Sequence, residues 1–397
     1  MSLKILIIAT EASGDKLGAN LIDGLNSELN SNQKVVFQGI AGPLMKSKGV
    51  VSLFDYAELS AMGIVEVIPK IFKILKIIKK ISQYALAWRP DLIITIDGPD
   101  FSFRVAKKIK KNWPSAKIVH YVAPSVWAWR SYRTKTISKF VDHVLAVLPF
   151  EPPYMHKGGI SCDFVGHPIV SEQLPTNQDI RLFRASLGID RDTPIVSILP
   201  GSRTSEITRM MPIYIKSLKL VAKKFPNLVF VLASPPDVTE RVFHYLQRTD
   251  LKIIQIYENN NPLKFEERKK ILFSTSLAAI ATSGTVTLEL AKMGAPFLVA
   301  YRASFITETL LKIFVKLSSA TLINILTHRQ DIPELLFSKC TPENIFALLD
   351  SLLTDESLVK SQRLVVEKAM TDLGSLDLNP NIRAARSTLR FLFEYDR

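Results

Sequence analysis

The stretch "LKILIIATEASGDKLGANLI", residues 3–22, indicates the fold of the first part of the chain. Its Leu- and Ile-rich run meets Glu11 and Asp15 at once, which favours a first β-strand over a secretory signal peptide. The strand leads directly into a helix-like segment. Backbone N–H groups of Ser13, Gly14 and Asp15 at this helix start could bind an anion, although a capped helix start without a ligand fits the same residues.

Apolar runs rich in Ile and Val recur along the chain between helix-like segments. They are "LKILIIA" (3–9), "VVFQGIA" (35–41), "DLIITI" (91–96), "KIVHYV" (117–122), "HVLAVL" (143–148), "PIVSILP" (194–200), "LVFVLAS" (228–234), "LAAIATS" (277–283) and "APFLVAY" (295–301). This pattern is typical of parallel strands covered by helices on both faces. The patterning is weakest at 171–194, and 397 residues suit two domains. We therefore expect α/β domains at 1–170 and 171–397, with ligands at the carboxyl ends of strands.

The composition is that of a folded protein with a basic surface. Hydrophobic residues make up 47% and charged residues 22%, and the formal net charge is +14. Such a charge favours a nucleic acid, an anionic membrane or a phosphorylated substrate. No RNP-type motif, zinc finger or recognition helix accompanies it, so we expect no nucleic acid. Cys162 and Cys340 belong to no CxxC or Cys/His cluster, which argues against disulfides and structural zinc. Because no run approaches the ~20 apolar residues of a membrane span, we expect a cytosolic protein.

The loop "LPGSRTSEI" (199–207) predicts an anion contact in the second domain. Neither GxGxxG nor GxxxxGK[ST] occurs in the chain, so a dinucleotide dehydrogenase or a P-loop NTPase lacks its usual motif. Gly201 lets the backbone come close to a ligand, Ser202 can cap or donate, and Arg203 offers a forked contact for phosphate oxygens. A plain turn would fit the same tripeptide.

The loop "ATSGTVTLEL" (281–290) follows another strand of the same predicted sheet. Its Ser283, Gly284 and Thr285 suit a diphosphate at a helix start, and Glu289 could accept hydrogen bonds from ribose hydroxyls. Two phosphate-competent loops on one sheet favour a binding site over two unrelated turns.

The segment "HYVAPSVWAWRSYRTKTISK" (120–139) alternates aromatic and cationic residues. Trp127 and Trp129 beside Arg130 could stack on a sugar or a base, or could fill the space under a loop. Trp127 and Arg130 are therefore candidate substrate contacts.

The segment "AMGIVEVIPKIFKILKIIKKISQY" (61–84) is predicted to be an amphipathic helix. On a helical wheel one broad face is apolar and another is basic. The apolar face holds Ile68, Ile71, Leu75 and Ile78, and the basic face holds Lys73, Lys76 and Lys80. Such a helix can lie in a membrane interface with its lysines toward anionic headgroups. A core-packed helix with a solvated lysine face is the alternative.

Two aspartates follow the strand in "DLIITIDGPDFS" (91–102). They could cap a helix, hold a metal or take a proton from a substrate. Asp97 comes at the carboxyl end of the predicted strand, where a cleft is expected. Asp100 follows Pro99 and is better suited to a turn or to an N-cap. No second cluster of metal ligands accompanies either residue.

Taken in order, a set of motifs closely resembles the lipid-A-disaccharide synthase family of bacterial glycosyltransferases. The motifs are "EASGDKLGANLI", "GIAGPLMKSKG", "AMGIVEVIPKI", "IDGPDF", "HYVAPSVWAWR", "LPFE", "FVGHP", "LPGSR", "SGTVTLE" and "LINIL". They extend from the first strand to about residue 330. The resemblance implies a glycosyltransferase-B architecture, in which two Rossmann-like domains face each other across a cleft and the second domain holds most of the donor nucleotide.

The resemblance also implies a reaction and its partners. The expected reaction transfers 2,3-diacylglucosamine from UDP-2,3-diacylglucosamine to the 6-hydroxyl of 2,3-diacylglucosamine 1-phosphate, with inversion, giving lipid A disaccharide 1-phosphate and UDP. No metal and no organic cofactor are implied. The enzyme would be peripheral on the cytoplasmic face of the anionic inner membrane. Its last helices could pack on the first domain or on a partner subunit, since family members exchange C-terminal segments in a homodimer.

Site residues carry over motif by motif. Asp97 in "IDGPDF" becomes the candidate general base, and Arg203 in "LPGSR" a diphosphate contact. UDP would be held by Ser283, Gly284, Thr285 and Glu289, with Asn324 of "LINIL" nearby. The chain departs from the family pattern where Thr10 replaces a frequent glycine before "EASGD" and where Ile323 replaces a common proline before the asparagine. A UDP-sugar transferase with a different acceptor, and a non-catalytic binder, are the alternatives.

Overall fold

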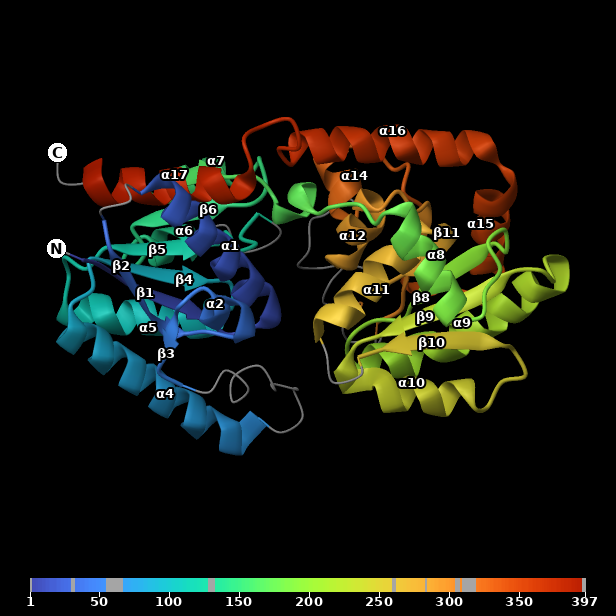
Figure 1. Ribbon diagram of the computed structural model, residues 1–397, viewed down its shortest axis with the longest axis horizontal. Helices are drawn as coiled ribbons and strands as arrows, with labels where there is room; N and C mark the ends of the chain where they lie inside the picture. The colour runs from blue at the N-terminus through green and yellow to red at the C-terminus, as the bar shows by residue number, and fades with distance from the viewer. Residues whose placement is uncertain are drawn as a thin grey trace. The chain divides into compact units, whose positions relative to one another are not determined.

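The structure is a computed structural model that describes residues 2–29, 33–54, 67–127, 133–258, 262–282, 284–303, 308 and 319–394. The chain divides into two compact units (Figure 1). Unit 1 comprises Met1–Ser171 and Leu373–Arg397, and unit 2 comprises Glu172–Asp372. The chain thus first passes from unit 1 to unit 2 one residue after the expected boundary. The C-terminal segment groups with unit 1, which is one of the two placements expected for the end of the chain.

Unit 1 is built on a parallel sheet with the strand order β3-β2-β1-β4-β5-β6-β7. Its strands are β1 (Leu3–Ala9), β2 (Val35–Ile40), β3 (Val51–Ser52), β4 (Leu92–Ile96), β5 (Ile118–Tyr121), β6 (His143–Ala146) and β7 (Ser161–Phe164). Every residue of β4, β5 and β6 is buried. Such continuous burial fits central strands with helices on both faces.

Helices cover both faces of this sheet (Figure 1). They are α1 (Ala12–Glu28), α2 (Pro43–Ser47), α4 (Val67–Trp88), α5 (Pro99–Asn112), α6 (Thr134–Ile137), α7 (Pro152–Lys157) and α17 (Pro380–Glu394). Apolar side chains of α4, α5 and α6 share one core with the strands. Helices α1 and α17 pack against each other on the opposite side.

A buried polar network fastens α17 to the sheet of unit 1. His143 of β6 lies within 2.8 Å of Ser387 Oγ through Nε2 and within 2.9 Å of Ser161 Oγ through Nδ1. Ser387 donates its only proton to Asp163 at 2.6 Å, so Nε2–H of His143 must be a donor and Nδ1 an acceptor. Burial lowers the pKa of His143 to about 4, despite the attraction of Asp163, so the ring is neutral near pH 7. The ring also stacks on Phe391.

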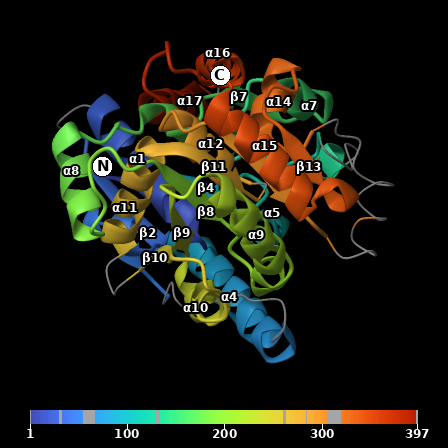
Figure 2. The same ribbon diagram turned by 90° about the vertical axis from the view of Figure 1, so that its right-hand side faces the viewer.

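Unit 2 repeats the parallel architecture with the strand order β10-β9-β8-β11-β12-β13. Its strands are β8 (Ile195–Leu199), β9 (Val229–Ser234), β10 (Ile253–Tyr257), β11 (Ser276–Ala281), β12 (Phe297–Tyr301) and β13 (Glu334–Leu336). Its helices are α8 (Asn177–Ser186), α9 (Thr204–Lys224), α10 (Thr239–Leu246), α11 (Pro262–Ser274), α12 (Val286–Lys292), α14 (Leu322–Thr327), α15 (Pro342–Thr354) and α16 (Glu356–Asp372). Helices α9 and α15 pack side by side (Figure 2) and, with α10, share a core with the strands.

The predicted α/β fold with two parallel sheets is confirmed, and each predicted apolar run overlaps a strand. Four observed strands were not among the predicted runs: β3, β7, β10 and β13. All four are edge strands of their sheets. An edge strand has a neighbour on one side only, and these strands are less buried than the central ones, so their sequences lack a continuous apolar run.

Helix α4 is amphipathic, but its apolar stripe differs from the predicted one. Ile78 is buried together with Ile77 and Ile81, whereas Leu75 is 44% exposed. The buried positions recur at helical spacing and Leu75 falls beside them, so it lies among the lysines. The side chains of Ile68 and Ile71 lie outside the described residues. No helix in the described parts of the chain is long and apolar enough to cross a membrane.

Candidate functional site

In unit 1 the strand order reverses between β1 and β4. The two strands pair, with Ala9 opposite Ile96, and their connections lead to β2 on one side and to β5 on the other. Ligands of such sheets bind outside the carboxyl ends of the strands at this switch point. The two loops meet closely here, because a Cβ at Gly98 would lie 2.6 Å from Thr10 Oγ1.

Asp97 lies at this switch point, directly after β4. Its backbone has a left-handed φ of 49° and is fixed by a 2.9 Å hydrogen bond from its N–H to the carbonyl of Tyr121. Ser102 donates to the Asp97 carbonyl at 2.8 Å, and the Gly98 N–H donates to Oδ1 at 2.8 Å. The side chain is half-buried. A carboxylate held at a strand end in this way can accept a proton from a bound hydroxyl.

Asp100 does not cap the following helix. Gly98 is the N-cap residue of α5, and Asp100 is exposed in the first helical turn. The N-cap interpretation of Asp100 is therefore wrong, because the helix begins at Pro99. The positive end of the helix dipole still stabilises a carboxylate in the first helical turn.

The loop after β1 places its three candidate residues in different environments. Ser13 is exposed in the first turn of α1, and Gly14 is buried. Asp15 is only 2% exposed and its carboxylate accepts hydrogen bonds from the N–H groups of Gly42, Leu44 and Met45. The Asp15 N–H donates to the backbone carbonyl of Glu11 at the start of the helix. The structure therefore gives Asp15 a structural role, holding the start of α2, in place of the predicted anion contact.

The aromatic loop after β5 is only partly described. Trp127 is half-buried and its indole Nε1–H donates to Glu151 Oε1 at 3.3 Å. Trp129 and Arg130 lie outside the described residues. His120 of β5 is fully buried, and its Nε2 is the one buried side-chain polar atom in the described parts of the chain without a hydrogen-bond partner. Burial lowers the pKa of His120 to about 3.

In unit 2 the strand order reverses between β8 and β11. Their ends are tied together where the Thr282 N–H donates to the Leu199 carbonyl at 3.1 Å. The loop after β8 is shaped by Glu206, which was not among the site residues predicted from the sequence. Its Oε2 accepts hydrogen bonds from the N–H groups of Ser202 at 3.0 Å and Arg203 at 3.2 Å. A Glu three residues after an N-cap is a known capping signal.

The Arg203 side chain extends from this loop and is 71% exposed, with Nη1 at 3.8 Å from Glu206 Oε1. It is thus available to an anion at the switch point. Gly201 has a φ of +111°, which glycine adopts without strain. These two residues occupy the places that the sequence predicted for a diphosphate contact.

The loop after β11 presents Gly284 and Thr285, both exposed, at the start of α12, while Ser283 lies outside the described residues. Glu289 of α12 forms an ion pair with Lys269 of α11 at 2.9 Å, and Lys269 also pairs with Glu266 at 2.8 Å. Burial alone would lower the pKa of Lys269, but the two carboxylates outweigh it and raise the pKa. Lys269 therefore stays charged, which fixes Glu289. No signal in the sequence linked Lys269 to Glu289.

Asn324 does not face a ligand site. It is buried, its Nδ2 donates to the Ile332 carbonyl and to Glu334 Oε1, and its Oδ1 accepts from the Ile332 N–H. Because both ends of the amide are occupied within unit 2, Asn324 ties α14 to β13. The structure thus gives it a structural role instead of the predicted substrate contact.

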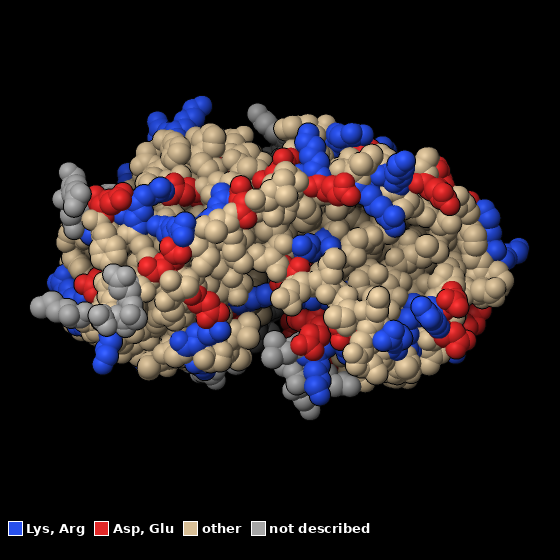
Figure 3. All heavy atoms as spheres, turned by 45° about the horizontal axis from the view of Figure 1, so that its top comes forward, with Lys and Arg blue, Asp and Glu red and all other residues tan. Residues whose placement is uncertain are grey.

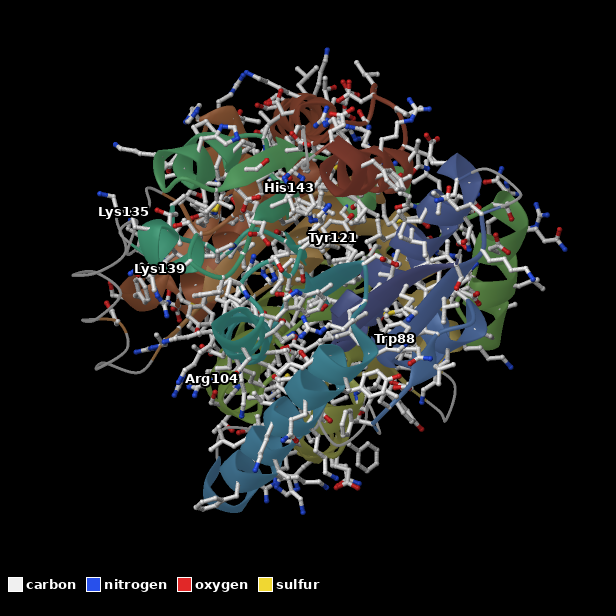
Figure 4. The ribbon with its side chains drawn as sticks, turned by 90° about the vertical axis from the view of Figure 1, so that its left-hand side faces the viewer. Trp88, Arg104, Tyr121, Lys135, Lys139 and His143 are labelled. Carbon is white, nitrogen blue, oxygen red and sulfur yellow. The ribbon has the colours of Figure 1, made fainter. Side chains whose placement is uncertain are left out.

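The positive charge gathers on one side of unit 1. No Asp or Glu lies between Asp100 and Asp142, whereas ten Lys and Arg residues do. Figure 4 shows Arg104, Lys135 and Lys139 extending outward from this part of the chain, while Tyr121 and His143 lie inside. On the face drawn in Figure 3, by contrast, basic and acidic side chains are interspersed.

Helix α4 adds an apolar component to this basic side. Phe72 is 73% exposed, and Lys73, Lys76 and Lys80 are exposed around it together with Leu75. Helix α4 packs on α5, which belongs to the stretch without acidic residues. Exposed apolar side chains among lysines are typical of helices that lie in a membrane interface.

The described parts of the chain contain no group of three or more His, Cys, Asp or Glu residues that could hold a metal ion.

The chain is similar to known proteins over nearly its whole length. The family model described as lipid-A-disaccharide synthetase matches residues 5–385. A lipid-A-disaccharide synthase of Ruegeria pomeroyi is 40% identical over 388 residues, covering 98% of this chain and 95% of the relative. Another, of Rhodospirillum centenum, is 36% identical over 390 residues, with coverage of 98% and 95%.

Solved structures show the same fold. A UDP-GlcNAc 2-epimerase of Neisseria meningitidis bound to UDP-GlcNAc has a TM-score of 0.62 at 13% identity, covering 99% of this chain and 100% of that chain. At this identity the likeness shows the fold alone.

Proposed function

The chain belongs to the lipid-A-disaccharide synthase family and is a glycosyltransferase of lipid A biosynthesis, and from this premise we propose its reaction. It transfers 2,3-diacylglucosamine from UDP-2,3-diacylglucosamine to the 6-hydroxyl of 2,3-diacylglucosamine 1-phosphate, with inversion at the anomeric carbon. The products are lipid A disaccharide 1-phosphate and UDP. The observation that carries the proposal is the place of Asp97 at the switch point of unit 1.

Asp97 acts as the general base in this proposal. A sugar hydroxyl is a poor nucleophile at neutral pH, so a carboxylate within hydrogen-bond reach must remove its proton as the new glycosidic bond forms. The backbone of Asp97 is fixed through Tyr121 and Ser102, which keeps the carboxylate in place. A single displacement by the activated oxygen inverts the anomeric carbon and needs no enzyme nucleophile.

Unit 2 binds the UDP part of the donor. Arg203 and the loop at Gly284 and Thr285 are assigned to the diphosphate, and Glu289 to the ribose hydroxyls. Arg203 stabilises the negative charge that builds on the leaving UDP. The Lys269 ion pair supports the role of Glu289, because it occupies one carboxylate oxygen and leaves other lone pairs for the ribose.

The enzyme works at the cytoplasmic face of the inner membrane in this proposal. Acylated substrates reside in a membrane, and the basic side of unit 1 suits an anionic surface. Phe72 and Leu75 would enter the interface while the lysines of α4 contact headgroups.

A homodimer with exchanged C-terminal segments is part of the proposal. Leu376, in the connection between α16 and α17, is 82% exposed. Exchange of α17 would require only this connection to take another course.

A product assay tests the reaction directly. The purified protein is incubated with UDP-2,3-diacylglucosamine and 2,3-diacylglucosamine 1-phosphate, with a chelator present. We expect a disaccharide and UDP, and NMR of the new linkage to show inversion. Unacylated glucosamine 1-phosphate serves as the control acceptor, because a related transferase with a different acceptor would not prefer the acylated one. Absence of the disaccharide would contradict the proposal.

A further inference from the structure

Glu151 is a buried carboxyl group to which the proposed reaction assigns no role. It ends the motif "LPFE" (148–151) after β6 and is 2% exposed. Its Oε2 accepts hydrogen bonds from the N–H groups of Val147 at 3.1 Å and Leu148 at 3.0 Å, and its Oε1 accepts from Trp127 Nε1 at 3.3 Å. Three donors therefore converge on one carboxylate.

Glu151 joins two neighbouring loops at the carboxyl edge of the sheet in unit 1. Trp127 belongs to the loop after β5, and Phe150 belongs to the loop after β6. Their rings meet edge-on, with 4.9 Å between the ring centroids. Backbone hydrogen bonds continue along this edge, from the Asp97 N–H to the Tyr121 carbonyl and from the Val122 N–H to the Leu145 carbonyl. The loop that carries Trp127 is thus held between the Asp97 loop and the Glu151 loop.

The hydrogen-bond pattern favours an ionised Glu151. All three partners are N–H donors, so none of them can accept the proton of a neutral carboxylic acid. A proton on Oε1 would face the Trp127 N–H and weaken that contact, which is already the longest of the three, while Oε2 keeps both backbone hydrogen bonds. Burial raises the pKa of Glu151 to about 7, even though the three hydrogen bonds act in the opposite direction.

Other titratable groups lie near Glu151. Cys162 of β7 senses its charge: burial first, and then the carboxylates of Glu151 and Asp163, raise the pKa of the thiol, which stays neutral. His156 of α7 contacts the Cys162 carbonyl through Nε2 at 2.9 Å. Neither the neutral thiol nor this imidazole occupies the place of the three N–H donors, so Glu151 is the group whose charge decides the contact to Trp127.

We propose that Glu151 is a positioning residue, which in its ionised form holds the Trp127 side chain in the arrangement that binds the acceptor sugar, and on protonation releases it. This inference rests on the proposed function, because it takes Trp127 to be an acceptor contact. The ionised form predominates above about pH 7, so acceptor binding is tightest on the alkaline side of neutrality. The effect falls on the KM for the acceptor and not on kcat, because Asp97 stays in place.

The test uses the full-length protein and the variants Glu151→Gln and Trp127→Phe. For each, kcat and the acceptor KM are measured from pH 5.5 to pH 9, and tryptophan fluorescence is titrated over the same range. In the wild type we expect the acceptor KM to rise by about tenfold at low pH, as for the loss of a hydrogen bond to a charged group. A fluorescence transition should accompany it near pH 7, and subtraction of the Trp127→Phe signal identifies Trp127.

Both variants should have a raised KM at every pH and no transition near pH 7. Glu151→Gln keeps the shape of the side chain but cannot ionise, and Trp127→Phe removes the indole donor while Glu151 remains. A wild-type pH profile in either variant would overturn the inference while leaving the proposed reaction intact. If the wild type forms no disaccharide, the proposed function fails instead, and the fluorescence titration still reports whether Glu151 controls Trp127.

Stability gives an independent readout of the same carboxyl group. Because burial raises the pKa of Glu151, the folded state binds the proton of this carboxyl group more tightly than the unfolded state does. The stabilisation of the fold by this proton is complete below the unfolded pKa and is lost as the pH rises through about 7. The free energy of unfolding of the wild type, relative to Glu151→Gln, should therefore fall between pH 5 and pH 8. A constant difference would contradict the titration of Glu151. If Glu151→Gln does not fold, Trp127→Phe alone decides the inference, and a wild-type acceptor KM in that variant overturns it.

Discussion

Gly201 and Glu206 approach each other so closely that a methyl group at position 201 would lie 2.4 Å from Glu206 Oε2. The same Oε2 accepts the N–H groups of Ser202 and Arg203. The glycine thus leaves room for the carboxylate that shapes the loop after β8, and the loop in turn places Arg203 at the switch point of unit 2.

Replacement of Gly201 by alanine should disturb this loop twice, through the positive φ and through the clash with Glu206. We expect a loss of about 1–3 kcal/mol in the free energy of unfolding, together with weaker UDP binding. Urea unfolding and calorimetric titration with UDP measure the two effects. Gly294→Ala is the matched control, since its φ is +80° and no atom lies within 4 Å of the added methyl group. Equal losses of stability in the two variants would contradict the steric role of Glu206.

The ion pair between Lys269 and Glu289 predicts a remote effect on UDP affinity. Lys269→Met removes the cation that fixes Glu289, so we expect UDP to bind about tenfold more weakly, equivalent to about 1.4 kcal/mol. Lys270→Met is the control, because Lys270 pairs with Glu172 instead. An unchanged UDP affinity in folded Lys269→Met would contradict the assignment of Glu289 to the ribose.

The basic face of α4 predicts electrostatic binding to membranes. Reversing Lys73, Lys76 and Lys80 to Glu should weaken binding to vesicles of anionic phospholipid by about a hundredfold or more, at about 1 kcal/mol for each lysine lost. Cosedimentation measures this binding, and added salt should weaken the wild type toward the variant. Reversal of Lys216, Lys223 and Lys252, which are exposed in unit 2, changes the net charge equally and is the control. Similar losses in the two triple variants would refute a specific role for α4.

The central strands could be predicted from the sequence, whereas the edge strands could not. Strands such as β4 are buried throughout and leave a continuous apolar run that marks them. Strands β7 and β13 are half-covered, and their short mixed sequences resemble loops. The return of α17 to unit 1 was open in the sequence, because it depends on contacts of His143 and Asp163 with Ser387, more than 200 positions away.

The positions of the site loops followed from the sequence, because loops after parallel strands must lie at the carboxyl edge of the sheet. The roles of single residues within the loops followed less well. Asp15 and Asn324 are both polar and near the expected sites, yet each uses its side chain to hold backbone groups of its own unit. Lys269 is the reverse case, since only the packing of α11 on α12 brings it to Glu289.

The most direct test of the account compares turnover and UDP binding in Asp97→Asn. The amide has nearly the shape of the carboxylate but cannot take a proton, so we predict that kcat falls by about 10²–10⁴-fold. The affinity for UDP should stay within about twofold, because unit 2 holds the nucleotide. Asp100→Asn, in the exposed first turn of α5, is the control and should keep a normal kcat. A wild-type kcat in Asp97→Asn would contradict the assignment of Asp97 as the base.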